Sequence, residues 1–130
     1  MRRGRDLRLP IAPGPVPGDS GWLALPDDEL VYRIESLPPD HERDDELVAV
    51  VRSNRHFFVR QEAAKRIRDA HRLKAFSGDR HIGQILARRM RRYEDVEYLE
   101  QLLQESRHLE VRNAVQAQLR LLRAALARKP

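Results

Sequence analysis

The residue types that could do chemistry in this 130-residue chain are arginines, lysines, carboxylates and five histidines. The sequence contains no cysteine, which excludes disulfides and thiolate metal sites. No histidine is followed by another at i+3 or i+4, the spacing by which one face of a helix binds a metal ion. We therefore interpret the histidines as turn or surface residues; they are His41, His56, His71, His81 and His108.

Patterns typical of catalysis are also missing from the sequence. Glu46, Glu62 and Asp69 fall on different faces of the expected helices, so they do not form an acid–base pair. The sequence has no nucleophile elbow, no P-loop and no dinucleotide-binding glycine pattern. These observations favour a non-catalytic protein that needs no cofactor and no metal.

Charge is distributed unevenly along the chain, whose formal net charge is +5. Residues 80–92 contain five arginines, and residues 112–129 contain five basic residues and no acid. Residues 94–110, in contrast, contain six acids and one arginine. A basic surface permits an acidic partner, although an arginine-rich composition is often only a solvated surface.

Helices must position these side chains, because the apolar residues recur at helical spacing and do not alternate with a period of two. A first helix is expected to begin near Pro26 and to end at Pro38-Pro39. From Asp44 the pattern is helical almost to the end, with turns at Ser53-Asn54 and Ser77-Gly78. The predicted core consists of Leu47, Val59, Ala63, Ile67, Ile82, Leu86, Met90, Leu99, Leu102, Val111, Val115 and Leu119.

Residues 1–25 are expected to form a flexible Pro/Gly-rich tail outside a helical domain at residues 26–130. Prolines and glycines cluster there, and a proline disfavours helix for the residue before it. The tail is either a disordered leader or a docking arm anchored by Trp22, Leu23 and Leu25. Both interpretations remain open.

Three of the expected helices align without gaps. They are residues 59–67 (VRQEAAKRI), 82–90 (IGQILARRM) and 111–119 (VRNAVQAQL), with apolar residues at the first, fifth and ninth positions. A leucine-bearing segment precedes each of them, which predicts helix–turn–helix pairs. A pair this short cannot bury its apolar stripe alone, so neighbouring pairs are expected to stack.

The segments HFFVRQEAAKRIRD and LEVRNAVQAQL resemble the second helix of HEAT-like repeats, with its pattern xVRxxAaxxL. The resemblance spans residues 44–122, and the middle copy departs from it because Gly83 replaces the arginine. It implies an all-α fold, a short right-handed α-solenoid of three helical hairpins, and a scaffold or adaptor role. It also implies that Arg60 and Arg112 bond carboxylates of adjacent repeats, with Asp69 as a candidate partner.

The alignment places basic residues at equivalent positions of successive repeats. Stacking would bring such positions into a column on the face opposite the apolar stripe. The predicted partner-binding residues are Lys65, Arg68, Arg88, Arg91 and Arg120. The alternative is a solvated face neutralised by the acidic segment at residues 94–110.

Two binding functions remain open from the sequence. One is an adaptor for a protein with an acidic surface, and the other is a nucleic-acid-binding module that uses the arginine column. Binding to nucleobases usually needs aromatic residues beside the basic ones. The only tryptophan lies in the expected tail, so protein binding is favoured. Self-association through the end helix around Leu121, Leu122 and Leu126 is a further hypothesis.

Two further expectations concern local features of the chain. Phe57-Phe58 should open a helix, with one ring against the turn and the other in the core. No apolar run approaches the roughly 20 residues of a membrane span, and the N-terminus lacks the apolar region of a signal peptide. The sequence therefore favours a cytoplasmic protein without membrane contact.

Overall fold

The computed structural model describes residues 21–128, and all regular structure within this range is helical. The α-helices are α1 (Asp27–Glu35), α2 (Asp44–Arg52), α3 (Phe57–Arg66), α4 (Arg80–Arg89), α5 (Val96–Glu105) and α6 (Leu109–Ala127). The 3-10 helices are η1 (Trp22–Ala24), η2 (Ala70–Phe76) and η3 (Tyr93–Asp95). The predicted all-α class is confirmed, since no strand occurs between residues 21 and 128.

Local sequence explains where several helices begin and end. Pro26 is the N-cap of α1, and three acidic residues follow it in the first turn, where they face the positive end of the helix dipole. The helix ends at Glu35, before the two prolines, as predicted. The turns expected at residues 53–54 and 77–78 separate α2 from α3 and η2 from α4.

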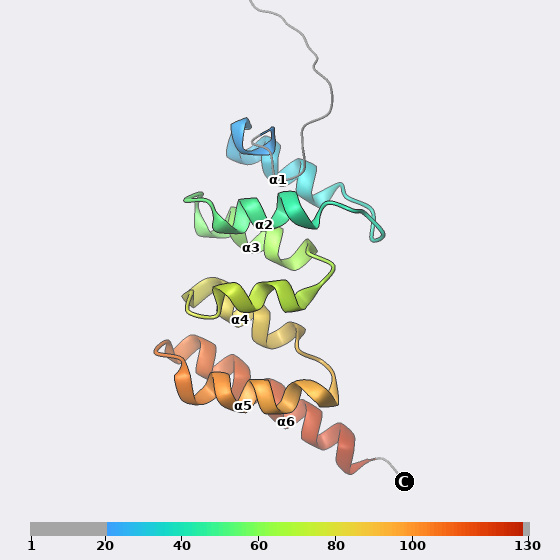
Figure 1. Cartoon of the computed structure of the whole chain (residues 1–130), viewed down its shortest axis with the longest axis vertical. Helices are drawn as coiled ribbons and strands as arrows, with labels where there is room; N and C mark the ends of the chain where they lie inside the picture. The colour runs from blue at the N-terminus through green and yellow to red at the C-terminus, as the bar shows by residue number, and fades with distance from the viewer. Residues whose placement is uncertain (1–20, 129–130) are drawn as a thin grey trace, which may run out of the picture.

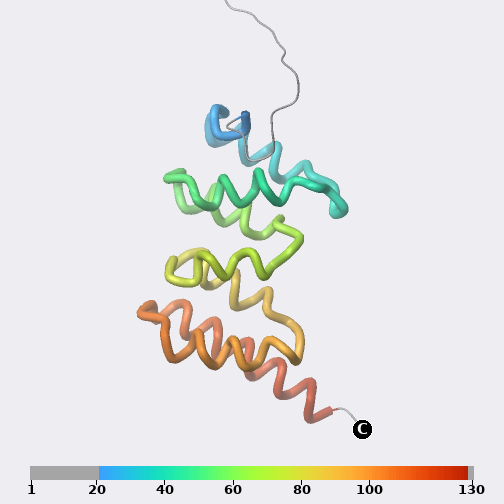
Figure 2. Tube along the Cα trace, viewed as in Figure 1, coloured from blue at the N-terminus to red at the C-terminus, as the bar shows by residue number. Residues whose placement is uncertain are grey.

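The helices stack in layers along the long axis of the molecule (Figure 1). Each of α2, η2 and α5 precedes a second helix, giving the pairs α2–α3, η2–α4 and α5–α6. Contacts between consecutive layers run through the second helices, from α1 to α3, from α3 to α4 and from α4 to α6. The trace in Figure 2 shows the chain running back and forth across the stack, with α1 at one end and α6 at the other.

The core lies where the apolar stripes of these helices meet, and the predicted core is confirmed. All twelve predicted residues are buried, and none is more than 4% exposed. Leu30 and Ile34 of α1 and Leu73 of η2 are also fully buried. Helical periodicity alone therefore identified the buried face of each helix correctly, because each helix has one apolar stripe, and neighbouring helices cover that stripe.

A second set of contacts between layers comes from polar residues at the eighth position of the aligned segments. Each reaches back to a carbonyl in or just beyond the last turn of the helix in the preceding layer (α1, α3 or α4), where carbonyls lack a helical partner. The bonds run from Arg66 to Leu37 O, from Arg89 Nη1 to Ala64 O (3.0 Å) and from Gln118 Nε2 to Met90 O (3.0 Å).

Arg60 joins two layers, as the resemblance implied, but through a different carboxylate from the one expected. Its guanidinium Nη2 lies 2.7 Å from Asp79 Oδ2, and its Nε donates to Val51 O at 2.7 Å. Asp69 instead accepts from His71 N at 3.1 Å and so caps η2. Arg112, in the last layer, is exposed and forms no ion pair with the residues that the structure describes.

Gly83, the residue that breaks the repeat pattern, packs against Val111 of α6. A Cβ atom at this position would be 2.9 Å from Val111 Cγ2 and 3.3 Å from Ser77 O. An arginine, which the repeat pattern would place here, therefore does not fit. The glycine allows α6 to pack against α4 at short range.

The expectation for Phe57 and Phe58 was wrong in one respect. They do open α3, but neither ring joins the core, and their exposed fractions are 43% and 44%. The ring of Phe57 stacks on that of His81, with centroids 4.3 Å apart. Both phenylalanines lie at the N-terminal end of α3, before the buried stripe that begins at Val59.

The described chain begins at Gly21, so the expected behaviour of residues 1–20 lies outside the described residues. Trp22, Leu23 and Leu25 are partly buried and pack against the core. Arg55 holds this segment, because it donates to Leu23 O at 2.5 Å and pairs with Asp27 at 2.8 Å. The three residues proposed as anchors are thus in contact with the helical body.

Candidate functional site

The five basic residues predicted to bind a partner lie on the second helices and on the segments that follow them. Lys65 and Arg88 are in the last turns of α3 and α4. Arg68 and Arg91 come after these helices have ended, since Ile67 and Met90 are extended C-caps with ψ of 128° and 90°. Arg120 differs, because α6 continues through it to Ala127.

Arg68 is committed to the fold. Its Nη1 donates to His41 O at 2.9 Å and to Asp40 O at 3.3 Å, both in the connection between α1 and α2. Its backbone N–H donates to Asp44 Oδ1 at 2.8 Å. These bonds satisfy carbonyls that no helix uses, so Arg68 stabilises the connection.

A hollow of about 700 Å³ brings together Lys65, Arg68 and Arg91 at the C-terminal ends of α3 and α4. Arg89 and Arg92, which were not predicted, also line it. Its two acids serve the backbone: Asp69 caps η2, and the buried Asp95 accepts from Arg92 N at 3.0 Å. Because five basic residues and two acids line the hollow, its lining is predominantly basic.

Arg89, which lines this hollow, is half-buried. Burial lowers the pKa of Arg89, and the nearby charge of Arg91 lowers it further, against the opposing effect of Asp44 and Asp69. Arg89 donates to Ala64 O at 3.0 Å, and this hydrogen bond holds its guanidinium in the basic hollow.

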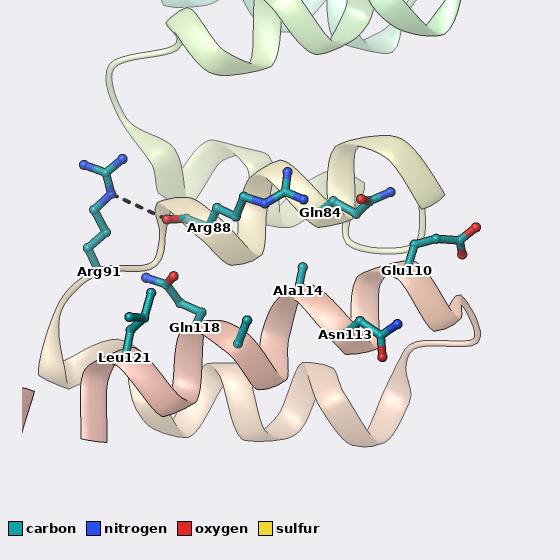
Figure 3. Close-up of a pocket in the computed structure, with 9 residues that line it drawn as sticks. Gln84, Arg88, Arg91, Glu110, Asn113, Ala114, Gln118 and Leu121 are labelled. Carbon is teal, nitrogen blue, oxygen red and sulfur yellow. Dashed lines mark hydrogen bonds between the residues drawn. The ribbon is translucent and has the colours of Figure 1, made fainter. Parts of the chain in front are cut away.

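A second hollow, a groove of about 790 Å³, runs between α4 and α6. Gln84, Arg88 and Arg91 line one side (Figure 3). Residues of α6 line the other side; they are Glu110, Asn113, Ala114, Ala117, Gln118 and Leu121. Arg91 Nε lies 3.5 Å from Arg88 O, a weak contact that leaves the rest of the guanidinium exposed.

Comparison of the chain with family models, with curated proteins and with solved structures gave no match. The nature of the site must therefore be argued from its own residues.

Arg91 is the predicted residue that the two hollows share, whereas Arg120 lines neither of them. The structure thus brings Lys65, Arg68 and Arg91 together, and Arg88 with Arg91, but leaves Arg120 apart on the exposed surface of α6. Arg68, Arg91 and Arg120 are equivalent in the alignment. However, α3 and α4 end before Arg68 and Arg91, whereas α6 continues through Arg120.

Ala117 was not among the residues predicted from the sequence, and Leu121 was predicted only for self-association; both line the α4–α6 groove. The sequence did contain a signal for Ala117, because the alignment places it at the position equivalent to Lys65 and Arg88. The predicted role of the C-terminal end in self-association stays a prediction. Leu121 and Leu126 are exposed to 65% and 36%, whereas Leu122 packs partly against the core.

The histidines serve the fold in several ways. His41 lies in a connection, as expected, but it is buried rather than on the surface. Its Nδ1 accepts from Arg43 N at 3.0 Å, so its Nε2 is the donor to Arg66 O at 2.8 Å. His56 accepts from Phe58 N at 3.3 Å as the N-cap of α3.

Within residues 21–128, no group of three or more histidine, cysteine or acidic side chains is arranged to hold a metal ion. In the same range, no helix is long and apolar enough to cross a membrane.

Proposed function

We propose that this chain is a HEAT-like repeat domain, a short α-solenoid, that acts without catalysis by binding an acidic segment of another protein. The support for a repeat architecture is the aligned second helices, which carry equivalent buried residues and equivalent bonds to the preceding layer. In such a stack the exposed faces of the second helices form one continuous surface. A cytoplasmic location remains part of the proposal.

The main support for the proposal is that Arg88 and Arg91 are exposed and unpaired within the described residues. Neither forms an ion pair with any described residue. Two acids of residues 94–110 line the hollows with them. Asp95 accepts from Arg92 N at 3.0 Å, and Glu110 lies 3.8 Å from Arg80. The acidic segment at residues 94–110 therefore leaves this basic surface open to an acidic partner.

The contribution of the other predicted residues differs. Arg68 bonds carbonyls of the α1–α2 connection, so its substitution would disturb the fold as well as binding. Lys65 is exposed and pairs with Glu62 at 3.1 Å, a surface pair that costs little to break. The binding residues are therefore Arg88 and Arg91, with Lys65 at the margin.

The test is charge reversal in the double variant Arg88→Glu/Arg91→Glu, with a fluorescent polyglutamate peptide as the probe. Reversal should weaken binding by about tenfold or more and reduce its salt dependence. The matched control is Arg112→Glu/Arg120→Glu, which makes the same charge change on exposed residues of α6 outside both hollows. Equal losses in both doubles would mean non-specific attraction and would overturn the proposal.

Nucleic acid is the competing partner. Of the exposed aromatic residues, Tyr93 favours it, because Tyr93 is 66% exposed and directly follows Arg91 and Arg92, whereas Phe57 does not. The exposed ring of Phe57 lies at the N-terminal end of α3, whereas Lys65 lies at its C-terminal end. Stacking platforms for bases place aromatic and basic residues side by side. A titration with single-stranded DNA decides the question: tight binding that is lost in Arg88→Glu/Arg91→Glu would replace the acidic protein by nucleic acid.

A further inference from the structure

The floor of the α4–α6 groove is unusually small and apolar for this surface. Ala117 stands where the aligned residues of α3 and α4 are Lys65 and Arg88. Ala114 and Ala117 both line the groove, and Ala114 is 9% exposed. Figure 3 shows Ala114 and Gln118 of α6 directed toward α4. The replacement of a long basic side chain by alanine creates the space.

Leu121 provides an apolar wall because α6 is longer than the helices that it resembles. The aligned residue after α4 is Arg92, which lies beyond the end of its helix. In α6 the helix continues to Ala127, so Leu121 lies one turn after Ala117 on the same side. Its side chain is 65% exposed, although it lines the groove.

The opposite wall consists of Gln84, Arg88 and Arg91 and is therefore cationic. The acid that lines the groove, Glu110, lies at the end away from Arg91 (Figure 3). An occupant that matches both walls must combine an apolar side chain with negative charge. We propose that the groove binds a short acidic peptide segment whose single large apolar side chain inserts between Ala117 and Leu121 while neighbouring carboxylates pair with Arg88 and Arg91. This inference rests on the proposed function and adds the requirement for the apolar residue.

Three features support a peptide over a bare acidic surface. The groove has about 790 Å³, which is enough for a large side chain and the adjacent backbone. Gln118 Nε2 donates to Met90 O, but Asn113 is exposed at the rim and can form a hydrogen bond with a peptide group. The small floor residues let a backbone approach α6 closely, which a surface of long basic side chains would prevent.

The experiment compares two peptides, Gly-Ser-Glu-Glu-Leu-Glu-Glu-Ser-Gly and the same peptide with serine in place of leucine. Binding to the full chain is measured by fluorescence anisotropy at physiological salt. The leucine peptide should bind about tenfold more tightly, the gain expected for partial burial of one leucine side chain.

Two variants locate the leucine. Ala117→Arg fills the floor with a side chain of the kind found at the equivalent positions, and it adds positive charge. It should therefore reduce the leucine-to-serine affinity ratio to about one, even where the added charge strengthens binding of both peptides. Gln116→Arg is the matched control, because it adds the same charge at an exposed neighbour outside the groove, and it should keep the ratio near ten. Circular dichroism melts of both variants establish that each is folded.

The outcomes separate this inference from the proposed function. Equal binding of both peptides to the unmodified chain would overturn the inference and leave the proposed function standing. Failure of both peptides to bind would overturn both. A preference for leucine that survives Ala117→Arg would place the apolar side chain elsewhere and overturn the inference. Concentration-dependent dimerisation that Ala117→Arg abolishes and Gln116→Arg does not would make the occupant a second copy, which also overturns it.

Discussion

Asp79 combines two roles in one side chain. It caps α4 by accepting from His81 N at 2.9 Å and Ile82 N at 3.0 Å, and it pairs with Arg60 across the layers. Burial alone raises the pKa of Asp79, but the hydrogen bonds from Ile82, Arg60 and His81, together with the charge of Arg60, outweigh burial and lower the pKa below its ordinary value.

A lowered pKa makes this carboxylate a source of stability that depends on pH. The stabilisation is fully present above the unfolded-state pKa of about 3.9 and is lost as the pH falls through the lower pKa of the folded state. Asp79→Asn keeps an N-cap acceptor but removes the charge, so it should lower the free energy of unfolding at pH 7, and the difference from the unmodified chain should shrink toward pH 3. Urea unfolding at several pH values measures this.

Asp79→Ala provides the matching control, because it removes the cap as well as the charge. It should cost a further 1 kcal/mol or so relative to Asp79→Asn, the typical value of an N-cap. If Asp79→Asn were as stable as the unmodified chain at pH 7, the ion pair with Arg60 would contribute nothing, and only the cap would matter.

At the scale of elements, the contact between α4 and α6 depends on Gly83. In most helices, replacement of glycine by alanine stabilises by about 1 kcal/mol. Here Gly83→Ala should instead destabilise by about 1–2 kcal/mol, because the new Cβ atom meets Val111 Cγ2 at 2.9 Å. Thermal or urea unfolding measures the change.

Two further variants test that interpretation. A Cβ atom added at Gly78 would have nothing within 4 Å, so Gly78→Ala should change stability by no more than about 0.5 kcal/mol. Combining Gly83→Ala with Val111→Ala should give a smaller loss than the sum of the two single changes, because each relieves the other. Strict additivity would mean that α6 does not press on Gly83.

At the scale of the whole molecule, stability should vary along the stack. The helices α3 and α4 have a second helix on either side, whereas α1 and α6 have one only on one side. Terminal units of such stacks lose structure first, because they have fewer packed neighbours. Native-state hydrogen exchange should therefore show the slowest amides in α3 and α4, and faster exchange in α1 and in α6 after Leu119.

Exchange followed by mass spectrometry resolves these segments. The exposed ion pairs of Arg123 and Arg80 should not change which helices exchange fastest, because exposed ion pairs contribute little to stability. Uniform exchange rates from α1 to α6 would show that the molecule opens only as a single unit, and would contradict the gradient.

The buried faces of the helices follow from the amino-acid sequence alone. Val59, Ile82 and Val111 begin stripes whose spacing matches the helical period, and a stripe of this kind can be stabilised only by covering it. The helix ends also followed from local chemistry, as at Pro26 and before Pro38. These properties depend on residues close together in the chain, so an alignment of short segments was enough to find them.

The role of each charged or exposed residue depends on how the helices pack in three dimensions. Arg68, Arg91 and Arg120 share one aligned position, yet Arg68 bonds the α1–α2 connection, Arg91 is open and Arg120 lies apart. A long side chain takes its role from whichever carbonyl or carboxylate lies within reach, and residues distant in sequence supply those groups. Phe58 stays exposed for a related reason, since a ring is buried only where a neighbouring element covers it.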